Sequence, residues 1–271
     1  MTSDAGPEPI AFSEESSTVW SFPTRGVWAT HRGDYPGNWP PQLVRNIILR
    51  YSRQNETVLD PMCGSGTTLI ETKLLSRRGV GLDISERAVE TARSRLDFSP
   101  PVAPSAVVQE VRLGDARDLS FLADGSVSLC ALHPPYSDII RYAPGVEGDL
   151  SSLHEVGAFL DEMEKVGREV FRVLRGGGTC CLLIGDTRRR GLYVPLAMRL
   201  LMRFLPLGFE MREEVIKVQW NCGATEKWRQ RAKDCGFLLI AHEHLFVLRK
   251  PMEVEKSPLL ALEMSAQSSR N

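Results

Sequence analysis

Alternation of short apolar runs with amphipathic helical stretches predicts an α/β fold, built on a doubly wound sheet that is parallel except for its last strand. Two observations carry this prediction. Residues 58–60 are apolar up to an acidic end and run into a turn with Gly64 and Gly66 ahead of a helix, as a buried parallel strand does. Residues 210–218 and 238–250 are extended runs that can pair as a terminal hairpin. With 42% hydrophobic residues, the 271-residue chain can bury the core of one domain.

The expected elements follow one another without a domain boundary. Strands are expected at residues 58–60, 79–83, 126–132, 179–185, 210–218 and 238–250, with a further strand ending at Gly114. Helices are expected at residues 41–51, 68–77, 86–96, 150–174 and 194–204. Thr67 or Ser65 can cap the second helix, Gly79 marks its end, and the glycines 176–178 end the fourth. The predicted organisation is a disordered tail at 1–18, a single domain at 19–254 and a flexible tail at 255–271.

The glycine turn indicates a nucleotide-like ligand that carries no phosphate. Asp83, about twenty residues past the turn, suits a ribose diol. Asp60, ahead of the turn, would repel a pyrophosphate but can accept hydrogen bonds from an ammonium group. The turn lacks a Gly-Lys-Ser/Thr ending and has two glycines where a dinucleotide fingerprint has three. A strand, turn and helix with a purely structural role is the alternative.

Residues 60–68, Asp-Pro-Met-Cys-Gly-Ser-Gly-Thr-Thr, resemble the cofactor motif of the DNA amino-methyltransferases, which methylate cytosine N4 or adenine N6. The resemblance implies a seven-stranded class I methyltransferase (Rossmann-like) sheet with an antiparallel last strand, and S-adenosyl-L-methionine as cofactor. Residues 37–44 resemble the segment that covers the methionine end of the cofactor; an ordinary helix with aromatic packing is the alternative. The cofactor-binding residues expected on this basis are Trp39, Pro41, Asp60, Pro61, Met62, Cys63, Gly64, Gly66, Thr67, Asp83, Ile84, Asp115 and Ala116.

A second motif, His-Pro-Pro-Tyr, follows the expected strand at 126–132. Two prolines forbid both helix and ladder bonding, so the chain leaves the sheet extended with its carbonyls free to accept hydrogen bonds. The motif resembles the catalytic motif of the same family, which has Asp, Asn or Ser at its first position. The resemblance implies His133, Pro134, Pro135 and Tyr136 as catalytic residues.

The roles expected for these residues follow from the methylation of an exocyclic amino group, the reaction that the resemblance implies. The Pro134 carbonyl and the His133 side chain would accept hydrogen bonds from the target amino group, and neutral His133 can also take up the proton. Tyr136 would stack on a base that has been flipped out of a duplex. Asp115 and Ala116 would contact the adenine of the cofactor.

Three inserts, residues 137–149, 186–191 and 219–236, are expected to be recognition loops. The last two carry basic residues interleaved with aromatic ones, which suits phosphate contact and base stacking. Since the formal net charge is −1, nucleic acid would have to be held by such a local basic surface. Ordinary solvated loops are the alternative. The nucleic-acid-binding residues expected here are Arg188, Arg189, Arg190, Trp220, Lys227, Trp228, Arg229 and Arg231.

Other features point away from metals, membranes and secretion. The six cysteines form no Cys-x-x-Cys pair, which favours a reduced, cytoplasmic setting. Cys222, Cys235, His242 and His244 match no common zinc-ligand spacing, so no metal is expected. No apolar run reaches the length of a membrane span, and the N-terminus lacks a basic region followed by an apolar one.

These observations predict an S-adenosylmethionine-dependent DNA methyltransferase that flips its target base, with cytosine N4 favoured over adenine N6. Two alternatives remain open. One is an RNA amino-methyltransferase, and the other is a catalytically inactive subunit that binds S-adenosylmethionine and nucleic acid. DNA is the expected partner, RNA the alternative one, and a homodimer or partner subunit is left open.

Overall fold

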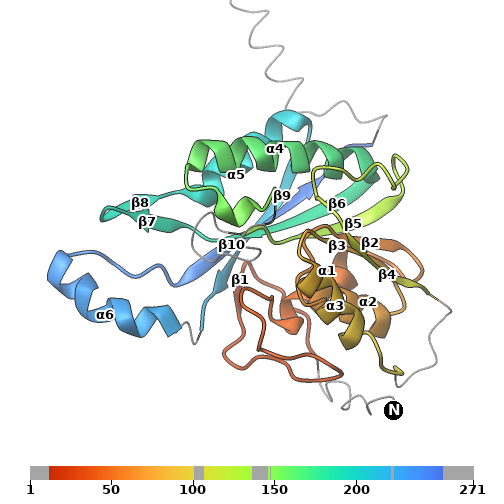
Figure 1. The fold of residues 1–271 in the computed structure, drawn as a ribbon, viewed down its shortest axis with the longest axis horizontal. Helices are drawn as coiled ribbons and strands as arrows, with labels where there is room; N and C mark the ends of the chain where they lie inside the picture. The colour runs from red at the N-terminus through yellow and green to blue at the C-terminus, as the bar shows by residue number, and fades with distance from the viewer. Residues whose placement is uncertain (1–11, 101–106, 136–145, 147, 221–222, 253–271) are drawn as a thin grey trace, which may run out of the picture.

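The structure is a computed structural model and describes residues 12–100, 107–135, 146, 148–220 and 223–252, without the side chains of 223–227. Its centre is an eight-stranded sheet in the order β1-β9-β10-β6-β5-β2-β3-β4 (Figure 1). The strands are β1 Val19–Ser21, β2 Thr57–Asp60, β3 Arg78–Asp83, β4 Gln109–Leu113, β5 Val127–Leu132, β6 Leu174–Ile184, β9 Glu210–Val218 and β10 His242–Arg249.

The predicted fold class is confirmed. Strands β4, β3, β2, β5 and β6 run parallel, and β10 pairs antiparallel with both β6 and β9. The sheet has one strand more than expected, because β1 pairs in parallel with the end of β9. Three residues are too few to show a strand pattern in the sequence, although Trp20 in their middle is buried.

Helices cover both faces of the sheet. The helices α1 Pro41–Tyr51, α2 Thr67–Leu74 and α3 Glu86–Arg95 lie on one face, and α4 Val156–Val173 and α5 Leu196–Phe204 lie on the other (Figure 1). In β6, Cys181 and Leu183 pack toward α1 while Leu182 packs toward α4 and α5. A strand buried on both faces needs apolar residues throughout, which explains the continuous apolar runs in the sequence.

Helix α2 is shorter than predicted and has no side-chain cap. It begins at Thr67 after Gly66, whose φ is 84°, and ends at Leu74, so the expected cap by Thr67 or Ser65 and the end at Gly79 were wrong. Gly79 lies inside β3, where an added Cβ would be 2.4 Å from Oγ1 of Thr72. The glycine therefore allows α2 to approach the sheet and does not end the helix.

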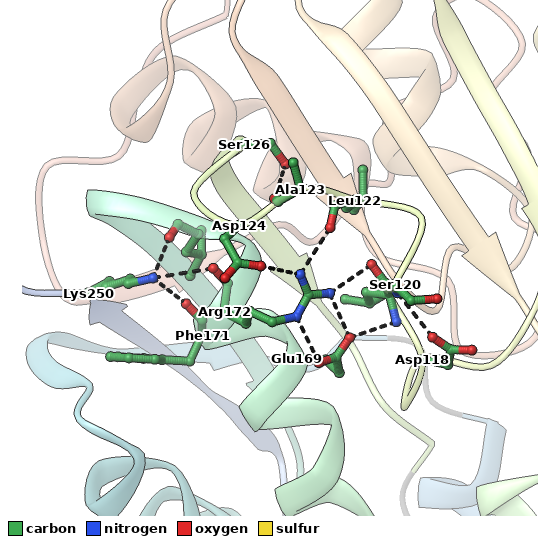
Figure 2. A network of polar contacts seen from close by, with 12 residues as sticks. Asp118, Ser120, Leu122, Ala123, Asp124, Ser126, Glu169, Phe171, Arg172 and Lys250 are labelled. Carbon is green, nitrogen blue, oxygen red and sulfur yellow. Dashed lines mark hydrogen bonds and ion pairs between the residues drawn. The ribbon is translucent and has the colours of Figure 1, made fainter.

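The C-terminal end of α4 is held by a network of polar contacts (Figure 2). The Arg172 guanidinium donates to the Glu169 and Asp124 carboxylates and to carbonyls of the loop before β5. Lys250, after β10, donates to the carbonyls of Phe171 and Leu174. Both cations lie where the unpaired carbonyls of a helix end favour positive charge. The glycines 176–178 belong to β6 and do not end the helix as predicted.

Two of the three inserts form regular structure in place of the expected loops. Residues 186–191 contribute to a separate hairpin of β7 Thr187–Arg189 and β8 Leu192–Val194. Residues 219–236 contain the helix α6 Gly223–Cys235. Figure 1 shows the hairpin and α6 projecting on the same side of the sheet. Most of the insert at 137–149 lies outside the described residues.

The ends of the chain are described only in part. Residues 1–11 and 253–271 lie outside the described residues, so the predicted tails stay predictions there. The backbone N–H of Glu15 donates to Oδ1 of Asn46 on α1 at 2.7 Å, so part of the expected N-terminal tail contacts the domain. Among the helices within the described ranges, none combines the length and the apolar character needed to cross a bilayer.

Candidate active site

A pocket opens at the edge of the sheet where β2, β3, β4 and β5 end. Its walls come from residues at or just past the ends of these strands, among them Pro61, Asp83, Asp115 and His133. Its empty volume is about 800 Å³, counting the mouth that opens to solvent. Ligands of open α/β sheets bind at the carboxyl ends of the strands, beside the point where the strand order reverses. Here that point is β2, which lies between β5 and β3.

The glycine turn forms one wall of the pocket. Gly64 has a φ of 50°, and its backbone N–H donates to Oδ2 of Asp83 at 2.9 Å. An added Cβ on Gly64 would be 3.0 Å from Cε1 of Tyr35, a second lining residue. Gly66 packs against α3 instead, where a Cβ would be 3.0 Å from that of Ala92. Gly64 therefore shapes the pocket, and Gly66 allows the two helices to pack closely.

Asp83 presents a carboxylate that is partly satisfied by the backbone. Its Oδ1 accepts from the N–H of Ser85 and its Oδ2 from Gly64, both at 2.9 Å. Burial raises the pKa of Asp83 above its usual range, and these backbone bonds oppose that effect. Each carboxylate oxygen keeps a lone pair after accepting one hydrogen bond. The side chain can therefore accept the two hydroxyls of a ribose.

Asp115, on the next wall, is oriented by Arg117. The Nε of Arg117 donates to both carboxylate oxygens at 2.9 and 3.0 Å, and its Nη2 donates to the Gly148 carbonyl at 3.1 Å. Burial raises the pKa of Asp115, but the hydrogen bonds from Arg117 outweigh it and leave the pKa lowered. The group is therefore an ionised acceptor at neutral pH, suited to an amino group such as that of adenine.

Asp60 lies beneath the turn and not on the pocket surface. Its side chain is fully buried and accepts hydrogen bonds from Oγ1 of Thr68 and the N–H of Met62. Burial raises its pKa to about 7, against the lowering effect of these bonds. The expected contact with an ammonium group is thus not available to Asp60 in this structure, because its oxygens face the protein. Pro41 and Gly66 also lie outside the pocket lining.

The other expected cofactor residues are brought together. Trp39, Pro61, Met62, Cys63, Gly64, Thr67, Asp83, Ile84, Asp115 and Ala116 all line the pocket, together with His133, Pro134 and Pro135 of the second motif. Tyr136 lies outside the described residues. The two motifs, more than sixty residues apart in the chain, therefore share one cavity.

The His133 side chain is 11% exposed and lies between aromatic and charged neighbours. Its ring packs edge-on against Trp39, with centroids 5.1 Å apart, and its Nε2 lies 4.0 Å from Oε1 of Glu243. Burial lowers the pKa of His133 to about 4, although Glu243 opposes this; Lys217 lowers it further. The protein itself supplies this burial. The ring is therefore neutral at physiological pH, and a neutral imidazole carries a lone pair on one of its nitrogens.

Several lining residues were not singled out from the sequence. They are Tyr35, Pro36, Ser65, Gly148, Asp149 and Leu150. Asp149 accepts from the backbone N–H and the hydroxyl of Ser151 at the start of the short helix η2 Leu150–Ser152. In the sequence, this pattern indicates a helix cap and gives no sign of a ligand. Tyr35 belongs to the aromatic segment at 28–41, which was the available signal.

The expected nucleic-acid residues lie outside the pocket lining, on the hairpin, on α6 and, for Trp220, between β9 and α6. Arg188 of the hairpin stacks over the rings of Tyr193 and Phe237, and its Nη2 donates to the Leu238 carbonyl at 2.9 Å. It therefore ties the hairpin to the segment that follows α6. Arg189 donates to the His154 carbonyl, while Arg190 is exposed between β7 and β8.

The second projection exposes aromatic rings beside basic groups. Trp228 on α6 is 45% exposed, and the guanidinium of Arg231 lies 4.9 Å from the centre of its ring. Trp220, between β9 and α6, is 51% exposed, and its Nε1 donates to Oγ of Ser21 on β1 at 3.0 Å. Arg229 is also exposed. The side chain of Lys227 lies outside the described residues.

The polar groups of the pocket fit the nucleoside part of S-adenosyl-L-methionine. Asp83 suits the ribose hydroxyls, Asp115 suits the adenine amino group, and Met62, Ile84 and Trp39 supply apolar walls. In the described part of the chain, no three His, Cys, Asp or Glu side chains gather in a way that could hold a metal ion.

The fold resembles that of a solved structure. The S-adenosylmethionine-dependent methyltransferase from Methanosarcina mazei aligns with 76% of this chain and 98% of its own, with a TM-score of 0.53 and 16% identity. At that identity, the comparison shows the class I methyltransferase fold and no more.

Sequence relatives match about a third of the chain. A Type II methyltransferase of Moraxella bovis is 30% identical over 99 residues, 36% of each chain. A Type II methyltransferase of Haemophilus parainfluenzae is 38% identical over 81 residues, 30% of this chain and 26% of its own. The tRNA (guanine(10)-N2)-dimethyltransferase of Methanothermobacter thermautotrophicus is 38% identical over 103 residues, 38% of this chain and 29% of its own. The matches thus span a minor part of each relative.

The family comparison matches an N-terminal part of the chain. Residues 8–94, which include the glycine turn and Asp83, match the family model described as DNA methylase, of the N6/N4 type. Over residues 8–94 the chain is thus similar to the DNA N4/N6 amino-methyltransferases, as it is to the two Type II relatives over a comparable length, and this similarity implies S-adenosyl-L-methionine as the cofactor.

Proposed function

We propose that this protein transfers a methyl group from S-adenosylmethionine to an exocyclic amino nitrogen of a base in DNA, with cytosine N4 ahead of adenine N6. One observation carries the proposal. The His133-Pro134-Pro135 segment lines the same cavity as Asp83 and Asp115, so a methyl donor held by the carboxylates would lie beside the acceptors of the second motif. The residue sequence of the glycine motif at 60–68 and the absence of Asp before Pro134 and Pro135 favour cytosine N4 over adenine N6.

The cofactor supplies a methyl group on a sulfonium, already activated toward a nucleophile. Asp83 accepts from the ribose hydroxyls and Asp115 from the adenine amino group. The positive φ of Gly64 lets the turn pass close to the ligand without a side chain in the way. Asp60 fixes the turn from beneath through Thr68 and Met62. The chain's part in this step is to hold the donor in one orientation.

The target nitrogen is a poor nucleophile because its lone pair is delocalised into the ring. Acceptors aimed at its N–H bonds favour a pyramidal nitrogen with the lone pair directed at the methyl group. The neutral ring of His133 and the carbonyl of Pro134 are the acceptors, and burial keeps His133 neutral. Tyr136 is proposed to stack on the flipped base, as the motif implies.

The two projections are proposed to hold the nucleic acid. The exposed Arg190, Arg229, Trp220 and Trp228 supply phosphate and stacking contacts of the kind that nucleic-acid surfaces use. RNA is the second candidate substrate, favoured by the tRNA methyltransferase among the relatives. The two relatives named as Type II methyltransferases favour DNA.

Methylation assays with nucleoside mass spectrometry test the proposal. The protein is incubated with methyl-labelled S-adenosylmethionine and with either DNA or RNA, and the nucleosides are then resolved. N4-methylcytosine from DNA is the expected product, and Gly64→Val is the control that should give none. N6-methyladenine from DNA would identify adenine as the target base. Label found in RNA alone would favour the RNA methyltransferase. If calorimetry detects cofactor binding but no methyl group is transferred to DNA or RNA, the result would favour a catalytically inactive subunit.

A further inference from the structure

The segment between β1 and α1 forms part of the pocket wall without regular structure of its own. Residues 24–39, all of which the structure describes, form neither a helix nor a strand, and we call them the strap. Its last residues, from Tyr35 to Trp39, line the pocket, and Trp39 packs against His133 with ring centroids 5.1 Å apart. An irregular segment keeps one position only if its contacts with the domain offset the entropy that it loses. The shape of the pocket therefore depends on the contacts that hold the strap.

A buried carboxylate on α2 holds two side chains of the strap. Glu71 is fully buried, and its Oε1 accepts a hydrogen bond from Nε1 of Trp28 at 2.6 Å. Nε2 of His31 lies 2.7 Å from the same oxygen. Trp28 and His31 are themselves buried, and their rings meet edge-on with centroids 5.6 Å apart. One oxygen of Glu71 is thus the meeting point of both strap residues.

The second oxygen of Glu71 bonds to the helix that follows the strap. Nη1 of Arg45, on α1, donates to Oε2 of Glu71 at 3.1 Å, and the Arg45 guanidinium lies 5.9 Å from the centre of the Trp28 ring. A carboxylate that is removed from water requires such donors, because burying a charge without partners is costly. Glu71 therefore joins α1, α2 and the strap through one side chain.

Glu71 also lies on the helix that begins at the glycine turn. Most of the turn at residues 63–67 lines the pocket, and Glu71 follows Thr67 by about one helical turn. On the strap side, Cε1 of Tyr35 would be 3.0 Å from a Cβ on Gly64, so the strap packs directly against the turn. The carboxylate thus connects two walls of the pocket while lying outside the pocket lining itself.

We propose that Glu71 is a positioning residue that sets the strap against the glycine turn, so that S-adenosylmethionine affinity depends on a carboxylate that the cofactor does not touch. The proposal rests on the cofactor pocket and not on the methyl transfer proposed above.

Titration calorimetry of the full-length protein with S-adenosylmethionine gives the first test. Replacing Glu71 alone would take the carboxylate from the buried Arg45 and destabilise the fold, so both are replaced in Glu71→Met/Arg45→Met, which keeps the interior apolar. This double variant should bind the cofactor about 10- to 100-fold more weakly, the scale of a lost hydrogen bond to a charged group. Glu71→Gln/Arg45→Met keeps an oxygen that can accept from Trp28 and should recover most of the affinity.

A single variant makes the test independent of the folding of the double one. Trp28→Phe removes the N–H donor and keeps an aromatic ring, and should weaken cofactor binding roughly 3- to 10-fold in the parent. The same substitution should have no further effect in Glu71→Met/Arg45→Met, because the acceptor is already gone. Parent-like affinity in Trp28→Phe would contradict the proposal.

Thr72→Val is the matched control for a purely structural role. Thr72 is the next residue of α2 and is fully buried, but its Oγ1 bonds to Oε1 of Gln109 at 2.6 Å, on β4 and not in the strap. The variant should lower the free energy of unfolding in urea and keep the parent's cofactor affinity. If affinity instead fell in proportion to stability in both Thr72→Val and Glu71→Met/Arg45→Met, the role of Glu71 would be structural only.

Fluorine spectra observe the strap without any ligand. The protein is labelled with 5-fluorotryptophan, and the signals of Trp28, Trp39 and Trp228 are identified by their loss in the corresponding Phe variants. In Glu71→Met/Arg45→Met, the signals of Trp28 and Trp39 should shift or broaden, because the strap no longer keeps one position. The signal of Trp228, on α6, should stay unchanged.

An unchanged Trp39 signal, or parent-like cofactor affinity, in Glu71→Met/Arg45→Met would overturn the inference. A parent that binds the cofactor but methylates no nucleic acid would instead refute the proposed function, and the calorimetry and the fluorine spectra would still decide the role of Glu71.

Discussion

The backbone N–H of Gly64 donates to Oδ2 of Asp83 across 2.9 Å, so the turn after β2 is bonded to the end of β3. The contact fixes a carboxylate and a backbone turn as one rigid corner of the pocket. A ligand that hydrogen-bonds to Asp83 must also pass close to Gly64.

This corner makes cofactor affinity sensitive to Asp83. Asp83→Asn should weaken S-adenosylmethionine binding by about 1.5–3 kcal/mol, because the ribose loses a charged acceptor. The measurement is titration calorimetry. The control is Glu110→Gln, which removes a carboxylate from the adjacent strand β4. Glu110 pairs with Arg112 outside the pocket, so this variant should keep the parent's affinity for S-adenosylmethionine. Equal affinities for the parent and Asp83→Asn would contradict the ribose contact.

The buried carboxylate of Asp60 should make stability depend on pH. Its pKa of about 7 in the folded protein lies above its ordinary value, so the folded state holds a proton that the unfolded state has released. The contribution is complete below the unfolded pKa and is lost as pH rises through about 7, by the order of 2–4 kcal/mol. Urea unfolding of the parent and Asp60→Asn at several pH values measures it. As pH rises through about 7, the free energy of unfolding of Asp60→Asn should fall less than that of the parent. Parallel plots of unfolding free energy against pH for the two proteins would refute the prediction.

The network at the end of α4 should matter for stability and not for binding. Arg172→Ala removes a guanidinium that bonds to Glu169, Asp124 and two carbonyls, and should lower the free energy of unfolding by about 1–3 kcal/mol. Arg168 on the same helix is 64% exposed and pairs only with Glu164 among the contacts described. Arg168→Ala should therefore cost less than about 1 kcal/mol. Similar losses in both variants would show that the network adds nothing beyond an exposed pair.

Arg190 offers the cleanest test of the basic hairpin. It is exposed and has a φ of 52°, which asparagine tolerates, so Arg190→Asn removes the charge with little backbone strain. The slope of nucleic-acid affinity against salt should fall by about one unit for one lost phosphate contact. Arg87→Gln removes an equally exposed charge from α3 and should leave the slope unchanged. Equal slopes for the parent and Arg190→Asn would exclude this residue from the interface.

The pH dependence of methyl transfer tests the histidine acceptor. His133 must be neutral to accept, and its pKa of about 4 predicts a single-turnover rate that is flat near neutral pH and falls only as pH approaches that value. His133→Ala should slow the chemical step far more than it weakens either ligand, and His133→Asn should recover part of the rate. If His133→Ala transfers the methyl group at the parent's rate, the Pro134 carbonyl alone is a sufficient acceptor.

The sequence predicted best the residues whose position follows from a strand end. Asp83 and His133 each come after an apolar run, and parallel strands bring their carboxyl ends to one edge, so their shared pocket could be expected. Asp60 shows the limit of this reasoning. It ends a strand too, but its neighbours Thr68 and Met62 supply hydrogen-bond donors beneath the turn, and only coordinates reveal which way the carboxylate faces.

Contacts between distant segments could not be predicted. Arg117 orients Asp115 and also reaches the Gly148 carbonyl, a contact between loops that no local pattern encodes. The ion pair of Glu243 with Lys217 depends on the register of β10 against β9. The helix α6 was expected to be a loop, because its basic and aromatic residues show a weak apolar periodicity on an exposed element.

The short strand β1 has a consequence for solubility. It covers only the last three residues of β9, from Ile216 to Val218, at the outer edge of the sheet. Without it, the N–H and C=O groups of these three residues on that side would be unpaired and could template the addition of a strand from another molecule. Trp20 anchors this cover in the core beneath α1. Truncation past residue 21 would therefore be expected to promote self-association through this part of the sheet edge.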